Sequence, residues 1–272
     1  KGRAEIRHTP HAIGSDDQIT TGDGDDVIVG GVANDTITAG AGNNIILGDN
    51  GNIDFTLDGD FATVDLVETI APEDGGGADV ITGSVGNNII VGGLGADSIT
   101  MTGGENVAIG DNARVLLYQG ALDEISSTET DLGDIDTIQT GSGNDIVVGG
   151  FADDALNAGE GNNIAIGDGV IIDYTQGAGT LETVQSLGTG DGGNDTITVG
   201  DGNDIAFGGA GDDAIEAGQG DNVVLGDNGL LDYRLDGNLN TVDLVETIAP
   251  ADGGGADMIH SGLGRDILVG GL

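Results

Sequence analysis

A unit of nine residues repeats along most of the chain, and this repeat restricts the possible folds more than any other feature. One copy runs from Gly30 to Thr38 and the next from Ala39 to Leu47. The first six residues of a copy are rich in glycine and end in Asp or Asn, and the last three are β-formers with an apolar residue at position eight. Glycine permits the positive φ angles of a tight turn, and β-branched residues suit a strand. Each copy therefore predicts a turn followed by a short strand.

The copies occur in blocks separated by inserts. Eighteen copies can be placed, and two copies complete one coil of 18 residues. We expect residues 1–11 to be the end of a preceding repeat or insert. We expect residues 12–272 to form one continuous β-roll, with hairpin inserts at 48–73, 110–130, 167–189 and 226–251. Residues 63–71 recur letter for letter at 241–249, which indicates a segment of a longer repetitive array.

The charge balance is strongly negative and excludes several classes of partner. The chain has 48 acidic and 6 basic residues, for a net charge of −42, which opposes a compact state unless cations are bound. Its 37% of hydrophobic residues are regularly spaced, which argues against disorder. We expect no nucleic-acid partner, because phosphates would repel the chain, and no direct membrane insertion, because no apolar run is long enough. Without cysteine, only oxygen-based metal sites remain plausible.

One copy, Gly208 to Glu216, reads Gly-Gly-Ala-Gly-Asp-Asp-Ala-Ile-Glu. It matches at every position the nonapeptide Gly-Gly-x-Gly-x-Asp-x-apolar-x of the hemolysin-type, or repeats-in-toxin (RTX), calcium-binding family. The chain resembles this family in tandem over about 60% of its length. The resemblance implies an all-β, parallel β-roll with several Ca²⁺ ions in its turns, held by position-six Asp side chains and backbone carbonyls. It also implies export to the exterior of a bacterium, commonly by type I secretion.

If odd and even copies stack on opposite edges, their position-six residues form two ladders. The odd ladder consists of Asp alone: Asp17, Asp35, Asp79, Asp97, Asp136, Asp154, Asp195, Asp213 and Asp257. Neighbouring rungs would lie about 4.8 Å apart, where two carboxylates repel by roughly 3 to 4 kcal/mol at an effective dielectric of about 20. A cation is therefore expected between rungs, and Ca²⁺ accepts carboxylate and carbonyl oxygens in flexible geometry. Asp136 is the weakest candidate, because residues 131–136 lack the glycine pair.

The even ladder is mixed and leaves two interpretations open. It reads Asp26, Asn44, Asn88, Asn106, Asp145, Asn163, Asp204, Asn222 and Asp266. Asn can give a carbonyl ligand or form a self-pairing amide ladder, so we expect fewer or weaker ions on this edge. An Asp also begins each insert: Asp49, Asp111, Asp168 and Asp227. These four either cap turns or bind additional calcium.

The outward positions seven and nine differ between odd and even copies. Odd copies carry mostly Thr, Ser and Gln, whereas even copies carry only Val, Ile, Leu and Phe. Such an apolar ribbon normally marks an interface. The inserts read as hairpins, the first running from Ile53 to Leu57, turning at Asp58 and returning through Val64, Leu66 and Ile70. We expect the four hairpins to form a third layer over the even sheet.

The repetition of the acidic residues argues against an enzyme, because an active site is needed once. The first hypothesis is a calcium-rigidified stalk or filament segment of an extracellular bacterial adhesin, surface-layer or matrix protein. The second is a C-terminal calcium-binding secretion and folding module of a type I-secreted enzyme or toxin. The third is an ice-binding threonine face, although Ala155/Asn157 and Ala214/Glu216 interrupt its rows. Neighbouring repeats of the same chain are the expected partners, and lateral self-association is left open.

Overall fold

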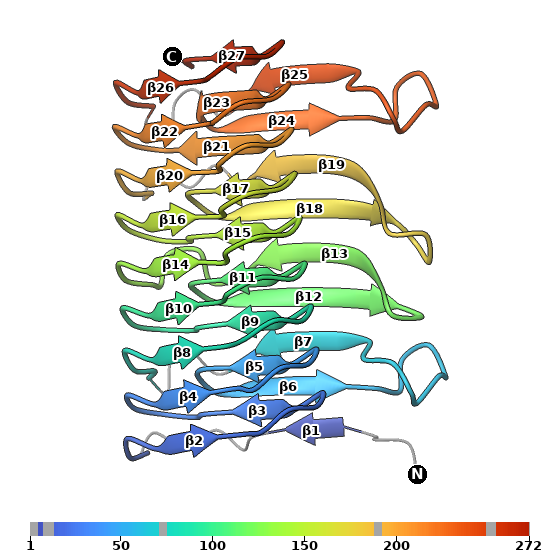
Figure 1. The fold of residues 1–272 in the computed structure, drawn as a ribbon, viewed down its shortest axis with the longest axis vertical. Helices are drawn as coiled ribbons and strands as arrows, with labels where there is room; N and C mark the ends of the chain where they lie inside the picture. The colour runs from blue at the N-terminus through green and yellow to red at the C-terminus, as the bar shows by residue number, and fades with distance from the viewer. Residues whose placement is uncertain (1–4, 8–13, 71–74, 188–191, 249–253, 272) are drawn as a thin grey trace.

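The protein is described by a computed structural model, which covers residues 5–7, 14–70, 75–187, 192–248 and 254–271. Every regular element in these ranges is a strand. The strands form three nine-stranded sheets, and within each sheet they stack along the long axis of the molecule (Figure 1). The expected all-β class is confirmed. The same ranges contain no helix long and apolar enough to cross a membrane.

Two of the sheets are parallel, and each coil contributes one strand to each of them. The odd copies form the odd sheet, made of β2 (Gln18–Thr20), β4 (Thr36–Thr38), β8 (Val80–Thr82), β10 (Ser98–Thr100), β14 (Thr137–Gln139), β16 (Ala155–Asn157), β20 (Thr196–Thr198), β22 (Ala214–Glu216) and β26 (Met258–His260). The even copies form the even sheet, made of β3 (Val27–Val29), β5 (Ile45–Leu47), β9 (Ile89–Val91), β11 (Val107–Ile109), β15 (Ile146–Val148), β17 (Ile164–Ile166), β21 (Ile205–Gly209), β23 (Val223–Asp227) and β27 (Ile267–Val269). The expected parallel β-roll is confirmed.

The position-eight residues fill the space between the two parallel sheets. The register is uniform, so that Ile28 pairs with Ile46 on the even sheet and Ile19 with Ile37 on the odd sheet. Inner coils bury this residue completely, as at Ile81 and Ile90, both 0% exposed. The coil therefore has a continuous aliphatic core, which a strict nine-residue period produces because every copy directs the same position inward.

The inserts build the third sheet, which is antiparallel and is called the hairpin sheet here. Its strands are β1 (Glu5–Arg7), β6 (Gly51–Asp54), β7 (Leu66–Thr69), β12 (Ala113–Tyr118), β13 (Ala121–Ser127), β18 (Val170–Thr175), β19 (Thr180–Ser186), β24 (Gly229–Asp232) and β25 (Leu244–Thr247). Each hairpin also pairs with the next one, for example β7 with β12. An inner row that includes Ile53, Val115 and Ile172 packs against the even sheet and is fully buried. The expected third layer is confirmed.

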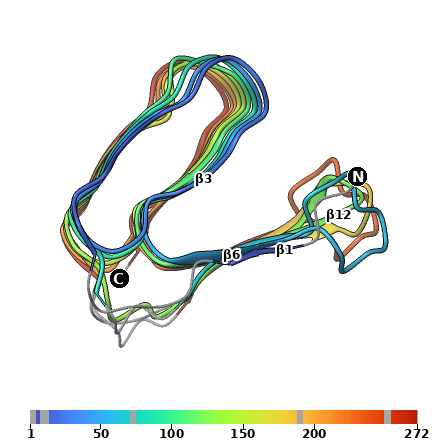
Figure 2. The same cartoon turned by 90° about the horizontal axis from the view of Figure 1, so that it is seen from below.

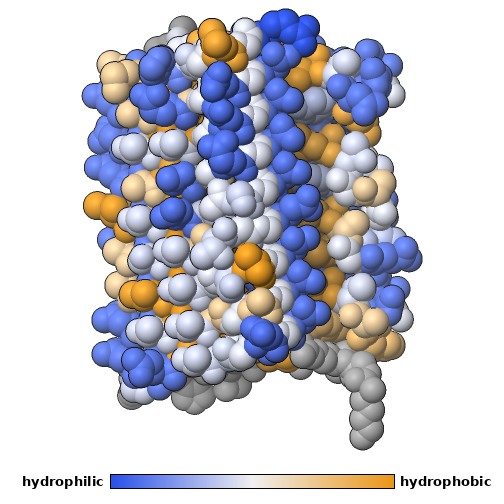
Figure 3. Space-filling model, viewed as in Figure 1, coloured by the Kyte–Doolittle hydropathy of each residue, from blue (hydrophilic) through white to orange (hydrophobic). Residues whose placement is uncertain are grey.

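The hairpin sheet covers the two rows of the apolar ribbon unequally. Seen along the coil axis, the hairpins leave the coil and lead away from it toward their tips (Figure 2). Position nine is completely buried in the inner coils, as at Leu47 and Val91, whereas position seven is half-buried at Ile45 and Ile89 and buried at Val107. The position-seven row lines a groove that Figure 3 shows as a recessed hydrophobic band between the coil and the hairpin tips.

The first hairpin differs in register from the sequence expectation. Ile53 pairs with Val67, and Leu66 pairs with Asp54. Val67 therefore faces the coil, whereas Leu66 lies on the opposite side of the sheet and outside the apolar cluster. A slip of one residue reverses every side chain of a strand, and the long connection between β6 and β7 does not fix the register as a two-residue turn would.

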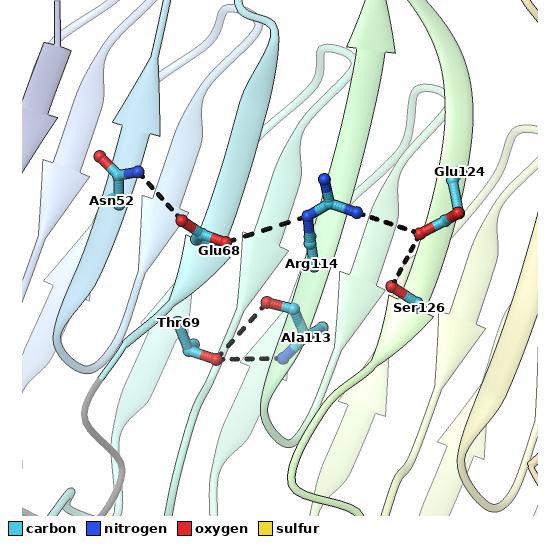
Figure 4. Close-up of polar contacts among 7 residues, drawn as sticks. All are labelled: Asn52, Glu68, Thr69, Ala113, Arg114, Glu124 and Ser126. Carbon is cyan, nitrogen blue, oxygen red and sulfur yellow. Dashed lines mark hydrogen bonds and ion pairs between the residues drawn. The ribbon is translucent and has the colours of Figure 1, made fainter.

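Polar side chains on the outer face of the hairpin sheet join neighbouring hairpins (Figure 4). Asn52 donates to Glu68 of its own hairpin at 3.0 Å. Arg114 of the second hairpin lies 4.0 Å from Glu68 and 3.2 Å from Glu124. On the inner face, Thr69 Oγ1 accepts from the backbone N–H of Ala113 at 3.1 Å. These half-exposed ion pairs contribute little stability individually, but they align adjacent hairpins.

Candidate calcium sites

The odd ladder is a buried column of carboxylates. In each rung after the first, Oδ1 accepts the backbone N–H of the preceding rung's Asp, in eight bonds of 2.7 to 3.1 Å that run from Asp17 to Asp257. The seven rungs from Asp35 to Asp213 are at most 2% exposed. Asp17 in the first coil is exposed, and Asp257 in the last coil is half-buried. The predicted stacking of all nine residues is therefore present.

The second oxygen of these side chains has no donor. Oδ2 is buried and without a hydrogen-bond partner in the eight rungs from Asp35 to Asp257. It points toward the first glycine after the preceding even strand: a Cβ at Gly92 would collide with Oδ2 of Asp97, and a Cβ at Gly149 with Oδ2 of Asp154. Glycine is needed there because the carboxylate fills the space of a side chain. A buried carboxylate oxygen without a donor requires a cation or a proton.

The pKa values of the buried Asp side chains in this column are raised, as expected for carboxylates that lack a partner at Oδ2. Burial raises the pKa of Asp97 to about 10, and the negative charge of Asp136 adds to the rise. Burial likewise raises the pKa of Asp136 to about 8 and that of Asp195 to about 9. Without metal, Asp97, Asp136 and Asp195 would therefore hold protons near neutral pH, and a bound divalent ion would have to displace them. Asp136, which lacks the glycine pair, has the same contacts as its neighbours.

The Asn rungs of the even ladder satisfy themselves. Oδ1 of Asn44 accepts the backbone N–H of Asp26 at 3.0 Å, the same bond that the odd ladder makes. Nδ2 of Asn44 donates to the turn carbonyls of Gly40 and Gly42 at 3.2 and 3.1 Å. It also donates to Oδ1 of Asn88 in the next coil at 3.0 Å. Of the two interpretations left open by the sequence, this geometry is that of the amide ladder.

The Asp rungs of the even ladder contrast with these Asn rungs. Oδ2 of Asp26, Asp145 and Asp204 is buried and has no hydrogen-bond partner. Asp and Asn have the same shape, and Oδ1 of both accepts the same N–H, so Oδ2 of Asp takes the place of Nδ2 of Asn. An oxygen then points at the turn carbonyl oxygens where Asn would offer a donor. Such a cluster of oxygens is what Ca²⁺ binds. Asp266, in the last coil, is half-buried.

The Asp residues that begin the inserts cap turns. Oδ1 of Asp49 accepts from the N–H of Gly77 at 3.2 Å, and Oδ2 accepts from that of Leu94 at 2.6 Å. These two donors belong to consecutive odd turns, so one carboxylate fixes the turn that follows the hairpin and the next turn above it. Asp168 makes the equivalent pair of bonds with Gly193 and Ala210.

The other two insert residues follow the same plan. Asp111 accepts from Phe151 at 2.6 Å, and Asp227 accepts from Gly255 at 3.0 Å. Oδ1 of Asp111 is buried without a hydrogen-bond partner. Burial raises the pKa of Asp111 to about 9, with the charge of Asp136 as the next cause. Capping is thus observed, and additional calcium at these four residues stays a prediction.

Position five is a functional position that the sequence reasoning missed. Its side chain accepts the backbone N–H of position five in the next coil, as Asn34 does from Ala78 at 2.8 Å and Asn43 does from Asn87 at 2.9 Å. Position six binds the coil before it and position five the coil after it, so each turn is held from both sides. The signal was available, because Asp or Asn occupies position five in most copies.

No group of three His, Cys, Asp or Glu side chains forms a ready metal cage among the residues that the structure covers. Any site in the turns must therefore combine one or two carboxylates with backbone carbonyls. A family model described as the RTX calcium-binding nonapeptide repeat (4 copies) matches five segments, residues 20–52, 73–108, 132–165, 189–224 and 251–272, which together make up more than half of the chain. The chain belongs to the RTX calcium-binding repeat family. Neither the curated proteins nor the solved structures gave a match.

RTX nonapeptide repeats bind Ca²⁺, and the turns of this RTX chain fit that ion. The family is structural, with calcium as part of its architecture. Among the described position-six residues of this member, the buried oxygens without a donor lie only on Asp rungs. The turns thus offer carboxylate and carbonyl oxygens, the ligands that Ca²⁺ prefers.

Proposed function

We propose that calcium binds the Asp rungs of both edges and that the Asn rungs of the even edge replace the ion by their own amide. On the odd edge the ligands are Oδ2 atoms of successive rungs together with turn carbonyls. On the even edge they are those of Asp26, Asp145, Asp204 and Asp266. One observation carries this assignment. At position six of the even turns, Asn places the donor nitrogen Nδ2 against the turn carbonyls, whereas Asp has an Oδ2 without a donor.

We further propose that the segment is a calcium-rigidified stalk portion of an extracellular bacterial protein and has no catalytic role. All three sheets run from the first coil to the last without interruption, so the segment has no joint within the described strands. Its stiffness then depends on the two edges, where the buried charges oppose stacking unless calcium is bound. Calcium outside a cell reaches the range of about 10⁻⁴ to 10⁻³ M at which extracellular modules are filled.

Small-angle scattering and circular dichroism of the whole chain, with calcium or with excess EDTA, test the metal-dependent fold. With calcium we expect a radius of gyration near 19 Å, roughly the value for 272 compact residues. With EDTA at neutral pH we expect a rise toward about 58 Å, the unfolded value, and loss of the β-signal. Magnesium in place of calcium is the control and should restore neither. A compact, fully β-structured chain in EDTA would refute the proposal.

Force spectroscopy tests the stalk role separately. Pulled from both ends in calcium, the chain should resist until coils detach and then extend toward about 950 Å, roughly 3.5 Å for each of the 272 residues. In EDTA it should extend smoothly without a force threshold. If calcium restores the β-signal but adds no mechanical threshold, calcium-dependent folding stands and the stalk role is wrong.

A further inference from the structure

The connection between β6 and β7 has the spacing of a twelve-residue calcium loop. Asp54, Thr56 and Asp58 occupy its positions one, three and five, Gly59 position six and Asp65 position twelve. EF-hand loops place oxygen ligands at positions one, three, five and twelve, and a glycine at six for a sharp turn. Gly59 has a φ of 89°, so the sixth residue makes such a turn here. The loop departs from the pattern in having Thr at three, Asp rather than Glu at twelve, and strands on both sides.

Asp65 lies inside this loop with one oxygen unused. The side chain is 1% exposed. Its Oδ2 accepts the backbone N–H groups of Leu57 at 2.7 Å and Asp58 at 3.4 Å, so the carboxylate points into the loop. Its Oδ1 is buried and has no hydrogen-bond partner. This is the same condition that marks the Asp rungs of the turns, at a place that belongs to no nonapeptide.

Asp58 is fixed beside it. Oδ1 of Asp58 accepts from the N–H of Asp60 at 2.7 Å, and Oδ2 accepts from the N–H of Gln119 in the second hairpin at 2.8 Å. The loop itself, residues 54–65, contains no Lys, Arg or His. Two neighbouring carboxylates without a basic residue in the loop favour a divalent cation.

We propose that loop 54–65 binds one Ca²⁺ ion at the carboxylates of Asp58 and Asp65, in addition to the ions of the turns. Neutral oxygens, such as the Thr56 hydroxyl, and water complete the coordination, since no third acidic side chain converges among the described residues. With two charged ligands and the short Asp at position twelve, the affinity falls in the weak range of extracellular modules, about 10⁻⁴ to 10⁻³ M. The ion joins the first hairpin tip to the second through Gln119.

The fourth hairpin contains a loop of the same length, in which an arginine side chain supplies the positive charge. In loop 232–243 the sixth residue, Gly237, has a φ of 80°. The loop closes by a backbone bond from Asp243 to Asp232 of 2.9 Å, as the first closes from Asp65 to Asp54 with 2.8 Å. The two loops therefore close in the same way and turn at the same position.

Position three of the fourth loop is Arg234 instead of Thr. Its guanidinium donates to Oδ1 of Asp232 at 3.1 Å and to Oδ2 at 2.9 Å. Arg234 lowers the pKa of Asp232 through its side-chain hydrogen bonds, and Asp243 is half-exposed. A fixed guanidinium beside the ligand positions repels a second cation. Loop 232–243 therefore remains free of calcium and serves as the internal control.

Terbium luminescence, excited where tryptophan but not tyrosine absorbs, can report on the first loop, because the chain has three tyrosines but no tryptophan of its own. The change Phe61→Trp places a single sensitiser in the loop at a residue that is 51% exposed. We expect Tb³⁺, added to the calcium-folded chain, to give emission sensitised by this tryptophan. Adding Asp65→Asn, which keeps the shape of the side chain, should weaken that Tb³⁺ binding by at least about tenfold. Equal emission with and without Asp65→Asn would overturn the proposal.

Two controls separate this site from those of the roll. Phe61 and Asp26 line the same groove, so an ion at the even edge contributes emission that Asp65→Asn leaves unchanged. Circular dichroism in calcium must show the same β-signal for Phe61→Trp with and without Asp65→Asn. A difference in emission then cannot come from a loss of folding. In the fourth loop, Leu239→Trp should report Tb³⁺ only when combined with Arg234→Thr. Emission with Arg234 in place would refute the blocking role of this residue.

Discussion

The replacement of Asp204 by Asn tests the assignment of ions to rungs in a single atom. Asp204 lies on the even ladder between Asn163 and Asn222 and is 1% exposed. Its Oδ1 accepts from the N–H of Asn163 at 2.7 Å, and its Oδ2 has no hydrogen-bond partner. The substitution exchanges this oxygen for an amide nitrogen without changing the shape of the side chain. We expect the variant to fold with less calcium and to bind one ion fewer.

The magnitude follows from the burial of the charge. Burial raises the pKa of Asp204 from 3.8 to about 7 in the metal-free roll. Above pH 7 the ionised side chain then costs the metal-free fold up to about 4 kcal/mol, at about 1.4 kcal/mol per pKa unit. Asn removes this cost and adds hydrogen bonds to turn carbonyls of about 1 kcal/mol each. The lost ion is worth about 4 kcal/mol only when free calcium exceeds its Kd about a thousandfold. The substitution should therefore stabilise the roll at low calcium and destabilise it near saturation.

The assay is the calcium concentration that restores half of the β-signal at neutral pH, with bound calcium counted by equilibrium dialysis at saturation. Asp204→Asn should lower the midpoint and remove one ion per chain. The reverse change, Asn222→Asp, is the matched control and should raise the midpoint and add one ion. The reasoning fails if Asp204→Asn leaves both the midpoint and the ion count unchanged.

Three further predictions use other parts of the fold. In excess EDTA, lowering the pH from about 8 to about 5 should increase the β-signal. Burial raises the pKa of Asp79 to about 7 and that of Asp97 to about 10. The metal-free roll therefore binds more protons than the unfolded chain in this range, and its stability rises as the pH falls. A β-signal that is flat over this range would contradict the cause given for the shifts. Ala33→Gly should stabilise the calcium-bound roll by about 1 kcal/mol in urea denaturation, because Ala33 has a φ of 88°. Ile172→Ala, at a fully buried residue of the hairpin sheet, should cost about 2 to 5 kcal/mol in the same assay and leave the number of bound calcium ions unchanged.

The nine-residue period made much of the roll predictable. Because every copy turns and extends in the same way, the sequence places Asp97 beside Asp79 and Asp136 without any knowledge of the tertiary structure. The same reasoning identified the buried position eight and the need for a cover over the even sheet. These features depend on local propensity and on strict repetition, which a single sequence displays.

Other features depend on contacts that repetition does not encode. The inward face of β7 is set by the closing bond between Asp65 and Asp54, which shifts the expected face from Leu66 to Val67. The capping role of Asp49 requires that two consecutive odd turns both present an N–H to one carboxylate. Its position after an even strand was visible in the sequence, but the two donors are 28 and 45 residues away along the chain.

The hairpin sheet projects from one side of the coil, and this shape has a mechanical consequence (Figure 2). Material placed far from the long axis resists flexing in the plane that contains it, because the outer rows must be stretched or compressed. The paired hairpins form a continuous hydrogen-bonded flange along that side. A longer array of this cross-section would therefore behave as a ribbon with one stiff and one compliant direction, rather than as a cylindrical rod with equal rigidity all round.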